Sequence, residues 1–395
     1  MTPQTVASRS PDASLYILTA LLFLAYLCVA VPLAVLPVHV TQTLGLSNAW
    51  AGLVVGVAFL STILSRGYAG RITDREGGKP AVMRGLIFYV VGAVVCMAAG
   101  FIDAPVAALA VLIAGRLVIG VGESLVTVGV VGWGIGLMGP ARSGRVLSLI
   151  GAAIYGAFAV GGPIGAGVAA HFGFIGAMAV ATVLPCLGLI AANGMSGPAP
   201  VPHAERPGLI SVLADIWRHG AVVCLQGIGF AAITSFFILY FMANGWGGAG
   251  LGFTLFGGGF VLMRVLFGGL TDRIGGIPVA LGSLGIEVVG QAMIWAAPNG
   301  MVALAGAFLT GVGCSLIFPA MGREVVQRVQ PHLRGTALGG FSAFQDLSYG
   351  LTGPLAGMLA DRSGFGVIFL VGAIAAAAGL ALTFSLRTAT TAPAG

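Results

Sequence analysis

The stretch GRITDREGGKP at residues 70–80 is matched by GGLTDRIGGIP at residues 268–278, an offset of 198 positions. Each copy holds an Asp-Arg pair, one further residue and then two glycines. A second match, at an offset of 191, pairs GGPIGAGVA at 161–169 with TGPLAGMLA at 352–360. Two long matches at similar offsets predict that the chain consists of two parallel repeats.

Composition defines the class of protein. The chain has 395 residues, of which 58% are hydrophobic and 8% are charged, whereas soluble proteins carry about 25% charged residues. Twelve apolar segments are each long enough for a helix to cross a bilayer. They lie at about 15–40, 49–68, 83–102, 105–130, 145–170, 173–195, 219–243, 249–269, 278–298, 300–322, 336–359 and 365–386. We therefore expect an all-α membrane protein with twelve transmembrane helices in two pseudo-symmetric six-helix bundles.

A Pro- and Gly-bearing polar stretch divides the protein. We expect an N-terminal bundle over residues 1–195, a cytoplasmic linker over 196–218 and a C-terminal bundle over 219–395. With the N-terminus inside the cell, 16 of the 18 Lys and Arg residues fall on cytoplasmic segments and helix ends, as the positive-inside rule requires. The prediction is a multi-pass protein of the inner membrane with both termini cytoplasmic.

The repeated loop resembles motif A of the major facilitator superfamily, in the pattern Gly-x-x-x-Asp-Arg-x-Gly-Gly. The resemblance covers essentially the whole chain, and it implies the fold of that family and transport by alternating access. More narrowly, stretches such as LSRGYAGRITD and DLSYGLTGPLAG resemble the YhhS/YfcJ-type branch of arabinose-efflux-like permeases. The implied conformational gate consists of Gly70, Asp74, Arg75, Gly268, Asp272 and Arg273.

Two further motifs bear on the direction of transport. LIAGRLVIGVGES on the fourth segment resembles motif B of the same family, with Arg116 in place and Ile119 where the family often has Gln. GAFAVGGPIGA on the fifth segment is similar to motif C, the antiporter signature. Gly162, Pro163 and Gly165 fit that motif, and Ala166 replaces its final glycine. This resemblance favours export over import, although a Gly/Pro packing groove would explain the same residues.

Charges inside apolar segments are costly, so they face cavities or partners and commonly have a function. Arg116 and Glu123 are seven residues apart on one segment, and their repeat counterparts are uncharged. We expect proton coupling at Glu123 and Asp346, with Arg116 as an ion-pair partner or a ligand for an anionic substrate. The full set expected around the substrate cavity is Arg116, Glu123, Asp346, Gln345, Tyr155, Gln226 and Glu287. A structural ion pair remains an alternative for Arg116 with Glu123, and a structural hydrogen bond remains one for Glu287.

Two arginines, Arg66 and Arg264, lie near cytoplasmic helix ends, and we expect their side chains to extend toward the membrane surface. The five cysteines lie inside apolar segments without a CxxC motif or a His cluster, so neither a metal site nor a disulfide framework is expected. A nucleotide-binding P-loop is absent from the sequence, and the basic residues are dispersed among short loops. We expect no cofactor, no nucleic-acid partner and no enzymatic activity, with the proton gradient as the energy source.

The function expected from these features is proton-coupled efflux of a small polar or amphiphilic solute, such as a sugar, a phosphonate or a drug, by a monomer. The first alternative is a proton symporter that imports a sugar, an organic acid or an amino-acid-like nutrient. The second is a membrane receptor that binds its ligand without transporting it. Flux under an imposed proton gradient distinguishes all three.

Overall fold

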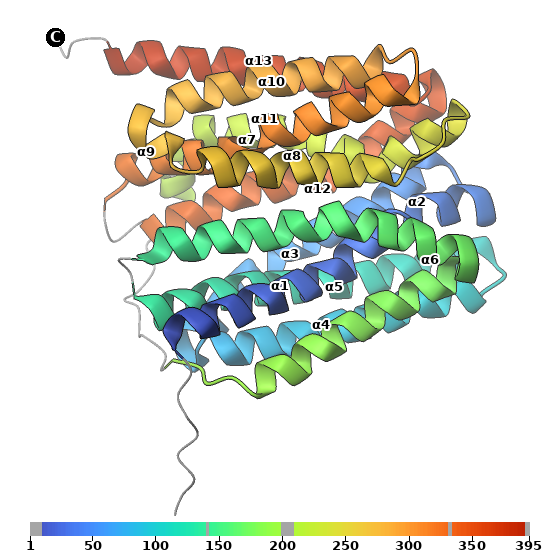
Figure 1. The fold of residues 1–395 in the computed structure, drawn as a ribbon, viewed down its shortest axis with the longest axis horizontal. Helices are drawn as coiled ribbons and strands as arrows, with labels where there is room; N and C mark the ends of the chain where they lie inside the picture. The colour runs from blue at the N-terminus through green and yellow to red at the C-terminus, as the bar shows by residue number, and fades with distance from the viewer. Residues whose placement is uncertain (1–9, 140–141, 199–208, 331–333, 392–395) are drawn as a thin grey trace, which may run out of the picture.

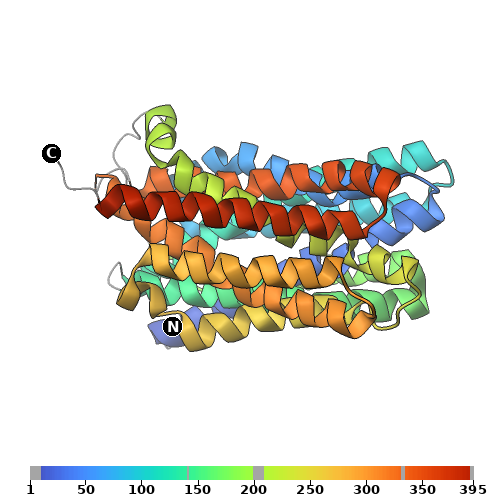
Figure 2. The same cartoon turned by 90° about the horizontal axis from the view of Figure 1, so that it is seen from above.

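The protein forms two helical bundles that lie side by side along their length (Figure 1). The computed structural model describes residues 10–139, 142–198, 209–330 and 334–391. Helices α1 to α6 make the N-terminal bundle, and α7 to α13 make the C-terminal bundle. Helix α1 begins and α13 ends at the same end of the molecule (Figures 1 and 2). We call this the terminal end and the opposite one the distal end.

The helices follow the apolar segments of the sequence and extend past several of them. The N-terminal bundle contains α1 (Pro11–Leu33), α2 (Leu36–Val38), the π-helical turn η1 (His39–Thr43), α3 (Asn48–Glu76), α4 (Gly78–Ala98), the short turn η2 (Ala99–Phe101), α5 (Pro105–Met138) and α6 (Ser143–Asn193). The C-terminal bundle contains α7 (Leu209–Ala243), α8 (Leu251–Phe267), α9 (Leu270–Ile274), α10 (Gly276–Trp295), α11 (Gly300–Arg328), α12 (Arg334–Ser363) and α13 (Gly366–Thr391).

These helices provide the twelve expected crossings. Among the described residues, nine helices are long and apolar enough to span a membrane. One of them, α6, has 51 residues and is broken at Gly173, where φ is 66°, so it supplies two crossings. The shorter apolar helix α8 supplies one more. Helix α12, whose 30 residues include many small and polar ones, supplies the last.

The repeated stretch forms a sharp turn in both bundles. Gly77 and Gly275 have φ values of 100° and 90°, a left-handed region that glycine enters without the steric penalty of a side chain. The expectation of a loop was nevertheless wrong for the first copy, because α3 stays helical through Glu76. In the second copy the helix is interrupted, and Asp272 and Arg273 lie on the separate short helix α9.

The expected linker is partly helical. Residues 199–208 lie outside the described residues, and α7 already begins at Leu209, ten residues before the expected start of the C-terminal bundle. The boundary of the N-terminal bundle, by contrast, lies close to the end of α6 at Asn193.

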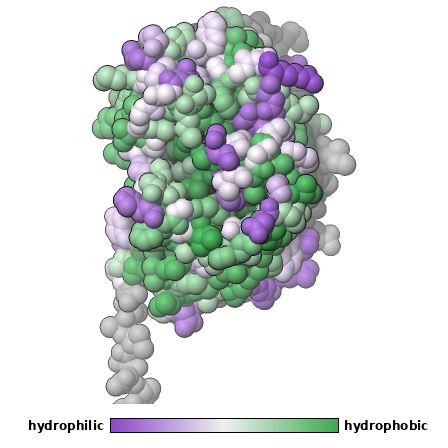
Figure 3. All heavy atoms as spheres, turned by 90° about the vertical axis from the view of Figure 1, so that its right-hand side faces the viewer, coloured by the Kyte–Doolittle hydropathy of each residue, from purple (hydrophilic) through white to green (hydrophobic). Residues whose placement is uncertain are grey.

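The bundles meet along two interfaces that the repeat relates to each other. Helix α3 packs on α12, and α8 packs on α6. Because α3 corresponds to α8 and α12 to the first half of α6, each interface is the pseudo-symmetric counterpart of the other. The outer helix faces expose large apolar side chains, among them Leu64 at 86% and Val265 at 71%. Viewed from the distal end, hydrophilic residues are scattered over a largely hydrophobic surface (Figure 3).

Candidate functional site

An ion pair joins the two bundles near the centre of the molecule. The Nε of Arg66 on α3 donates to Oδ2 of Asp346 on α12 at 2.8 Å, and Nη2 donates to the same oxygen at 2.5 Å. The side chains are 23% and 11% exposed. Charged groups withdrawn from solvent attract each other more strongly than surface pairs do. The expectation that Arg66 extends toward the membrane surface was wrong, because Asp346 holds its guanidinium at the interface.

A second carboxylate lies near this pair. Glu123 on α5 is 7% exposed, and its Oε1 accepts a hydrogen bond of 3.3 Å from the hydroxyl of Tyr26. The Tyr26 hydroxyl also lies 3.0 Å from Oγ1 of Thr127. Glu123 interacts electrostatically with Asp346 and Arg66. The structure thus brings together the two acids that the sequence analysis selected for proton coupling, one from each bundle.

Arg116 has a different environment. It is fully buried within the N-terminal bundle, where Nε donates to the carbonyl of Val54 at 2.9 Å and Nη2 to that of Val55 at 3.0 Å. The hydrogen bonds of Arg116 among the described residues go to the backbone of α3 and not to Glu123, although the two charges interact at longer range. Arg116 thus holds α5 against α3 through two hydrogen bonds to backbone carbonyls.

Aromatic side chains from both bundles fill the centre next to the ion pair. Tyr155 of α6 stacks on Phe260 of α8, with ring centroids 3.3 Å apart. Phe230 of α7 lies 5.4 Å from Phe158 of α6 and 4.3 Å from Tyr349 of α12, again between centroids. These rings form an apolar wall that crosses the interface, and the charged groups of Arg66, Asp346 and Glu123 lie at its border.

Arg264 lies on the other interface. Its Nη2 donates to the backbone carbonyl of Ser315 at 2.6 Å, and its guanidinium carbon lies 5.2 Å from the ring centre of Phe260. The Nε atom is buried without a hydrogen-bond partner. The expectation that Arg264 extends toward the membrane surface was therefore wrong, because its guanidinium is held at this interface.

The remaining expected cavity residues divide into two groups. Gln345 is partly buried beside Asp346 on α12. Gln226 and Glu287 are 1% and 0% exposed and lie next to the thiol of Cys314 inside the C-terminal bundle. They do not contact the ion pair between the bundles. A role for them around the substrate cavity stays a prediction.

The antiporter-like motif lies on the α6–α8 interface. A Cβ atom added to Gly162 would lie 2.5 Å from Cβ of Phe253 on α8, and one added to Gly165 would lie 2.3 Å from the carbonyl oxygen of Val31 on α1. Close approach of α6 to both neighbours thus depends on these glycines. Pro163 is accommodated within α6.

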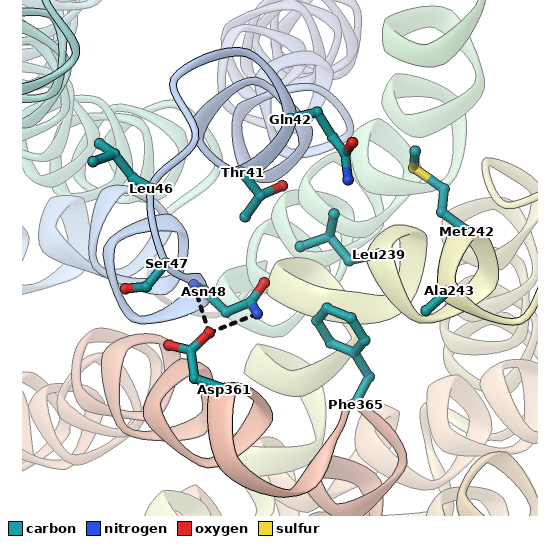
Figure 4. A pocket seen from close by; sticks show the side chains of 10 residues that line it. All are labelled: Thr41, Gln42, Leu46, Ser47, Asn48, Leu239, Met242, Ala243, Asp361 and Phe365. Atoms are coloured by element: carbon teal, nitrogen blue, oxygen red, sulfur yellow. Dashed lines mark hydrogen bonds between the residues drawn. The ribbon is translucent and has the colours of Figure 1, made fainter.

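A contact at the distal end was missed by the sequence analysis. Asp361 at the end of α12 accepts hydrogen bonds from the backbone N and the Nδ2 of Asn48, at 3.0 and 2.8 Å, and from the backbone N of Ala49 at 3.3 Å. A carboxylate at a helix N-terminus satisfies free N–H groups and interacts favourably with the helix dipole. Asp361 thus ties the start of α3 to the other bundle (Figure 4).

A hollow of about 500 Å³ lies beside this contact, lined by both bundles. Its N-terminal wall includes Gln42 and Ser47, and its C-terminal wall includes Leu239 and Phe365 (Figure 4). Below it, α3 and α12 touch backbone to backbone, because a Cβ on Gly52 would lie 2.0 Å from the carbonyl oxygen of Gly353. The distal end of this interface is therefore closed.

The motif A residues lie at the terminal end. Glu76 and Arg84 form an exposed ion pair of 2.7 Å, and Nζ of Lys79 donates to the carbonyls of Asn193 and Met195 at the end of α6. In the second copy, the carboxylate of Glu324 accepts from the backbone N of Gly276. These contacts stay within one bundle and do not test the expected gate. A gating role stays a prediction for Gly70, Asp74, Arg75, Gly268, Asp272 and Arg273. Among the described residues, no group of three His, Cys, Asp or Glu side chains is placed to hold a metal ion.

Comparison with known proteins agrees with this architecture. The family model of the major facilitator superfamily matches residues 18–248 and again 220–395. An uncharacterised MFS-type transporter of Salmonella typhimurium is 41% identical over 383 residues, which cover 96% of this chain and 98% of the relative.

Solved structures show the same fold at low sequence identity. The human organic anion transporter MFSD10 (TETRAN) superposes with a TM-score of 0.70 at 15% identity, over 95% of this chain and 100% of its own. A bacterial homologue of the human lysosomal transporter Spinster, in an inward-facing and unoccupied conformation, gives a TM-score of 0.76 at 14% identity, over 97% and 99%. With two repeats of six crossings, matching sequence models and matching folds, the chain belongs to the major facilitator superfamily of membrane transporters.

Proposed function

We propose that this secondary transporter exports a small polar or amphiphilic solute in exchange for protons. The observation that carries the proposal is the Arg66–Asp346 ion pair, which joins the bundles next to a second acid, Glu123. Alternating access requires the two bundles to change their contacts around a fixed site. A titratable pair across that contact couples the change to protonation.

The steps follow from the charges. When Asp346 is ionised, Arg66 holds α3 against α12. Protonation of Asp346 removes the charge that attracts Arg66, and the interface loosens. Glu123 lies within electrostatic range of the pair, so its own protonation changes the balance at the same site. A solute that binds between these groups competes with the proton, and this competition is what antiport requires.

The proposed orientation places the terminal end in the cytoplasm. This assignment rests on the Lys and Arg residues of the turns and helix ends at that end, among them Arg75, Lys79 and Arg273, and on the positive-inside rule. The closed contact between Gly52 and Gly353 then lies on the outer side of the membrane, and Asp361 acts as an outer latch. The motif A residues act as the corresponding inner gate when the outer side opens.

Export is favoured by the antiporter-like residues Gly162, Pro163 and Gly165, which bring α6 close to α1 and α8. Membership of the YhhS/YfcJ-type branch, which the sequence resembles, is part of the same proposal. Import of a nutrient would use the same ion pair, but it would move protons and solute in the same direction.

The test is substrate-dependent proton flux in everted membrane vesicles that contain the wild type, Asp346→Asn or the matched control Asp346→Glu. The probes are pentoses, phosphonates, organic acids and cationic drugs. Proton efflux from the vesicle lumen that depends on one probe class, is lost in Asp346→Asn and is retained in part in Asp346→Glu supports the proposal. Equal flux in all three proteins removes Asp346 from the mechanism, and co-directional flux converts the proposal to import.

A further inference from the structure

The internal repeat allows the two bundle interfaces to be compared residue by residue. An offset of 198 pairs Arg66 on α3 with Arg264 on α8, and an offset of 191 pairs Asp346 on α12 with Tyr155 on α6. The structure repeats this arrangement in part. Arg66 forms an ion pair with Asp346 across one interface. At the other interface, Arg264 and Tyr155 lie on the same ring, that of Phe260. The second interface thus presents the arginine without the carboxylate.

The surroundings of Arg264 leave its charge uncompensated. Among the described residues, its guanidinium contacts the backbone carbonyl of Ser315, at 2.6 Å, and the face of Phe260. Its Nε has no acceptor, and none of the described carboxylates forms an ion pair with it. A guanidinium that is partly withdrawn from water without an acid is costly. Such a group is stabilised when an anion binds to it, and Arg is suited to hold carboxylate or phosphonate oxygens with two parallel hydrogen bonds.

The side chains beside Arg264 indicate what the rest of such a ligand is like. Tyr155 stacks on Phe260 and contacts Phe230, with ring centroids 6.2 Å apart. These rings form an apolar wall from three helices of both bundles. A ligand that reaches Arg264 with an anionic group would therefore lay its apolar part against this wall.

We propose that Arg264, with Tyr155 and Phe260, binds the anionic group of the transported solute, and that the solute is a small organic anion with an apolar or aromatic body. This proposal rests on the proposed transport function and adds the substrate class. The anion takes the place that Asp346 occupies at the other interface. Arg66 is already paired, so the two arginines have different tasks: one holds the bundles together and the other recognises the solute.

The sequence relationship suggests a direct test. Tyr155→Asp places a carboxylate at the position equivalent to Asp346, so that Arg264 acquires an internal partner. Tyr155→Asn is the matched control, because it has nearly the same shape and no charge. Arg264→Gln removes the cation itself. The probes are benzoate and phenylphosphonate, with neutral benzamide and cationic benzylamine for comparison. The readouts are thermal stabilisation of the purified protein by each probe and probe-dependent proton flux.

The expected result is stabilisation of the wild type by the two anions and not by benzamide or benzylamine. Tyr155→Asp and Arg264→Gln weaken anion binding by about 10- to 100-fold, the range expected for losing a hydrogen-bonded charge partner. Tyr155→Asn loses the same ring contact as Tyr155→Asp but adds no charge, so its loss of anion binding is clearly smaller than that of Tyr155→Asp. The thermal unfolding temperature of each variant without a probe reports whether it is folded.

Three outcomes overturn the proposal: equal loss in Tyr155→Asp and Tyr155→Asn, equal binding of benzamide or benzylamine, or no response of the wild type to either anion. Its failure can be told apart from failure of the transport mechanism. Proton flux that depends on Asp346 but is driven by a neutral or cationic solute keeps the proton-coupled function and removes only the anion site.

Discussion

The two interfaces between the bundles are pseudo-symmetric in their helices but not in their chemistry. The α3–α12 interface has an ion pair, a contact between the backbones of Gly52 and Gly353, and the cap of Asp361 on α3. At the α6–α8 interface, Tyr155 replaces the acid, Phe253 packs against Gly162, and Ala170 is the repeat counterpart of Asp361.

This difference separates two tasks that a symmetric pair of interfaces would combine. Polar and backbone contacts with defined partners hold α3 and α12 in one arrangement and must be broken together. Aromatic contacts at the α6–α8 interface tolerate sliding, and they leave Arg264 without an acid. We infer that the first interface sets the conformation of the transporter and the second recognises the solute. The four substitutions below test the first half of this inference, in order of expected effect.

The largest effect is expected for Arg66→Ala. It leaves Asp346 at the interface without its cation, and removal of one partner of a buried pair costs more than removal of both. Transport should fall to background, and Arg66→Ala/Asp346→Ala should be more stable than Arg66→Ala alone. A double-mutant cycle on thermal stability measures the coupling. A coupling energy below about 1 kcal/mol, the range of surface pairs, would contradict a special role for this ion pair.

Gly353→Ala should have the next largest effect. The glycine faces Gly52, and a Cβ added at this position would lie 2.2 Å from a backbone oxygen that cannot rotate away. Overpacking of this kind costs about 1–3 kcal/mol, and here it acts against the distal closed state. A cysteine placed at Ala360, which is 7% exposed and lies two turns after Gly353 on α12, should therefore react faster with a membrane-impermeant thiol reagent. Gly258→Ala is the matched control, because the space around Gly258 is open. Equal reactivity in the two variants would show that the contact does not close the distal end.

Asp361→Asn should have a moderate effect. The amide keeps the shape but loses the charge that interacts with the N-terminus of α3, and such interactions are worth about 0.3–1 kcal/mol at exposed sites. We expect about a two- to fivefold increase in distal opening, measured by the same thiol reaction and reduced at high salt. Asp103→Asn removes another exposed distal carboxylate and should leave the rate unchanged. If both substitutions act alike, the effect belongs to surface charge in general and not to the latch.

Much of the architecture could be predicted from the sequence, because apolar length and the two repeat offsets are local signals. Glu123 and Asp346 could also be selected from the sequence, because a charged residue inside an apolar segment is rare and is itself a local signal. The partner of Asp346 was not visible. Arg66 is 280 positions away, and its repeat counterpart Arg264 is also an arginine. Only the packing of α3 on α12 shows that the side chain of Arg66 reaches Asp346. Asp361 was missed because its task depends on the start of a helix in the other bundle.

The smallest effect is expected for Glu76→Gln. This substitution tests whether the charges of the repeated stretch help to hold the α3–α12 interface closed. Glu76 pairs with Arg84 within one bundle, and both side chains are more than 40% exposed, so water replaces the lost partner. Transport and thiol reactivity at the distal end should stay within about twofold of the wild type, as for most surface substitutions. An increase in distal thiol reactivity comparable to that of Asp361→Asn would mean that the Glu76–Arg84 pair also stabilises the closed distal end. The inner gate would then extend beyond the Asp-Arg residues that the two copies share.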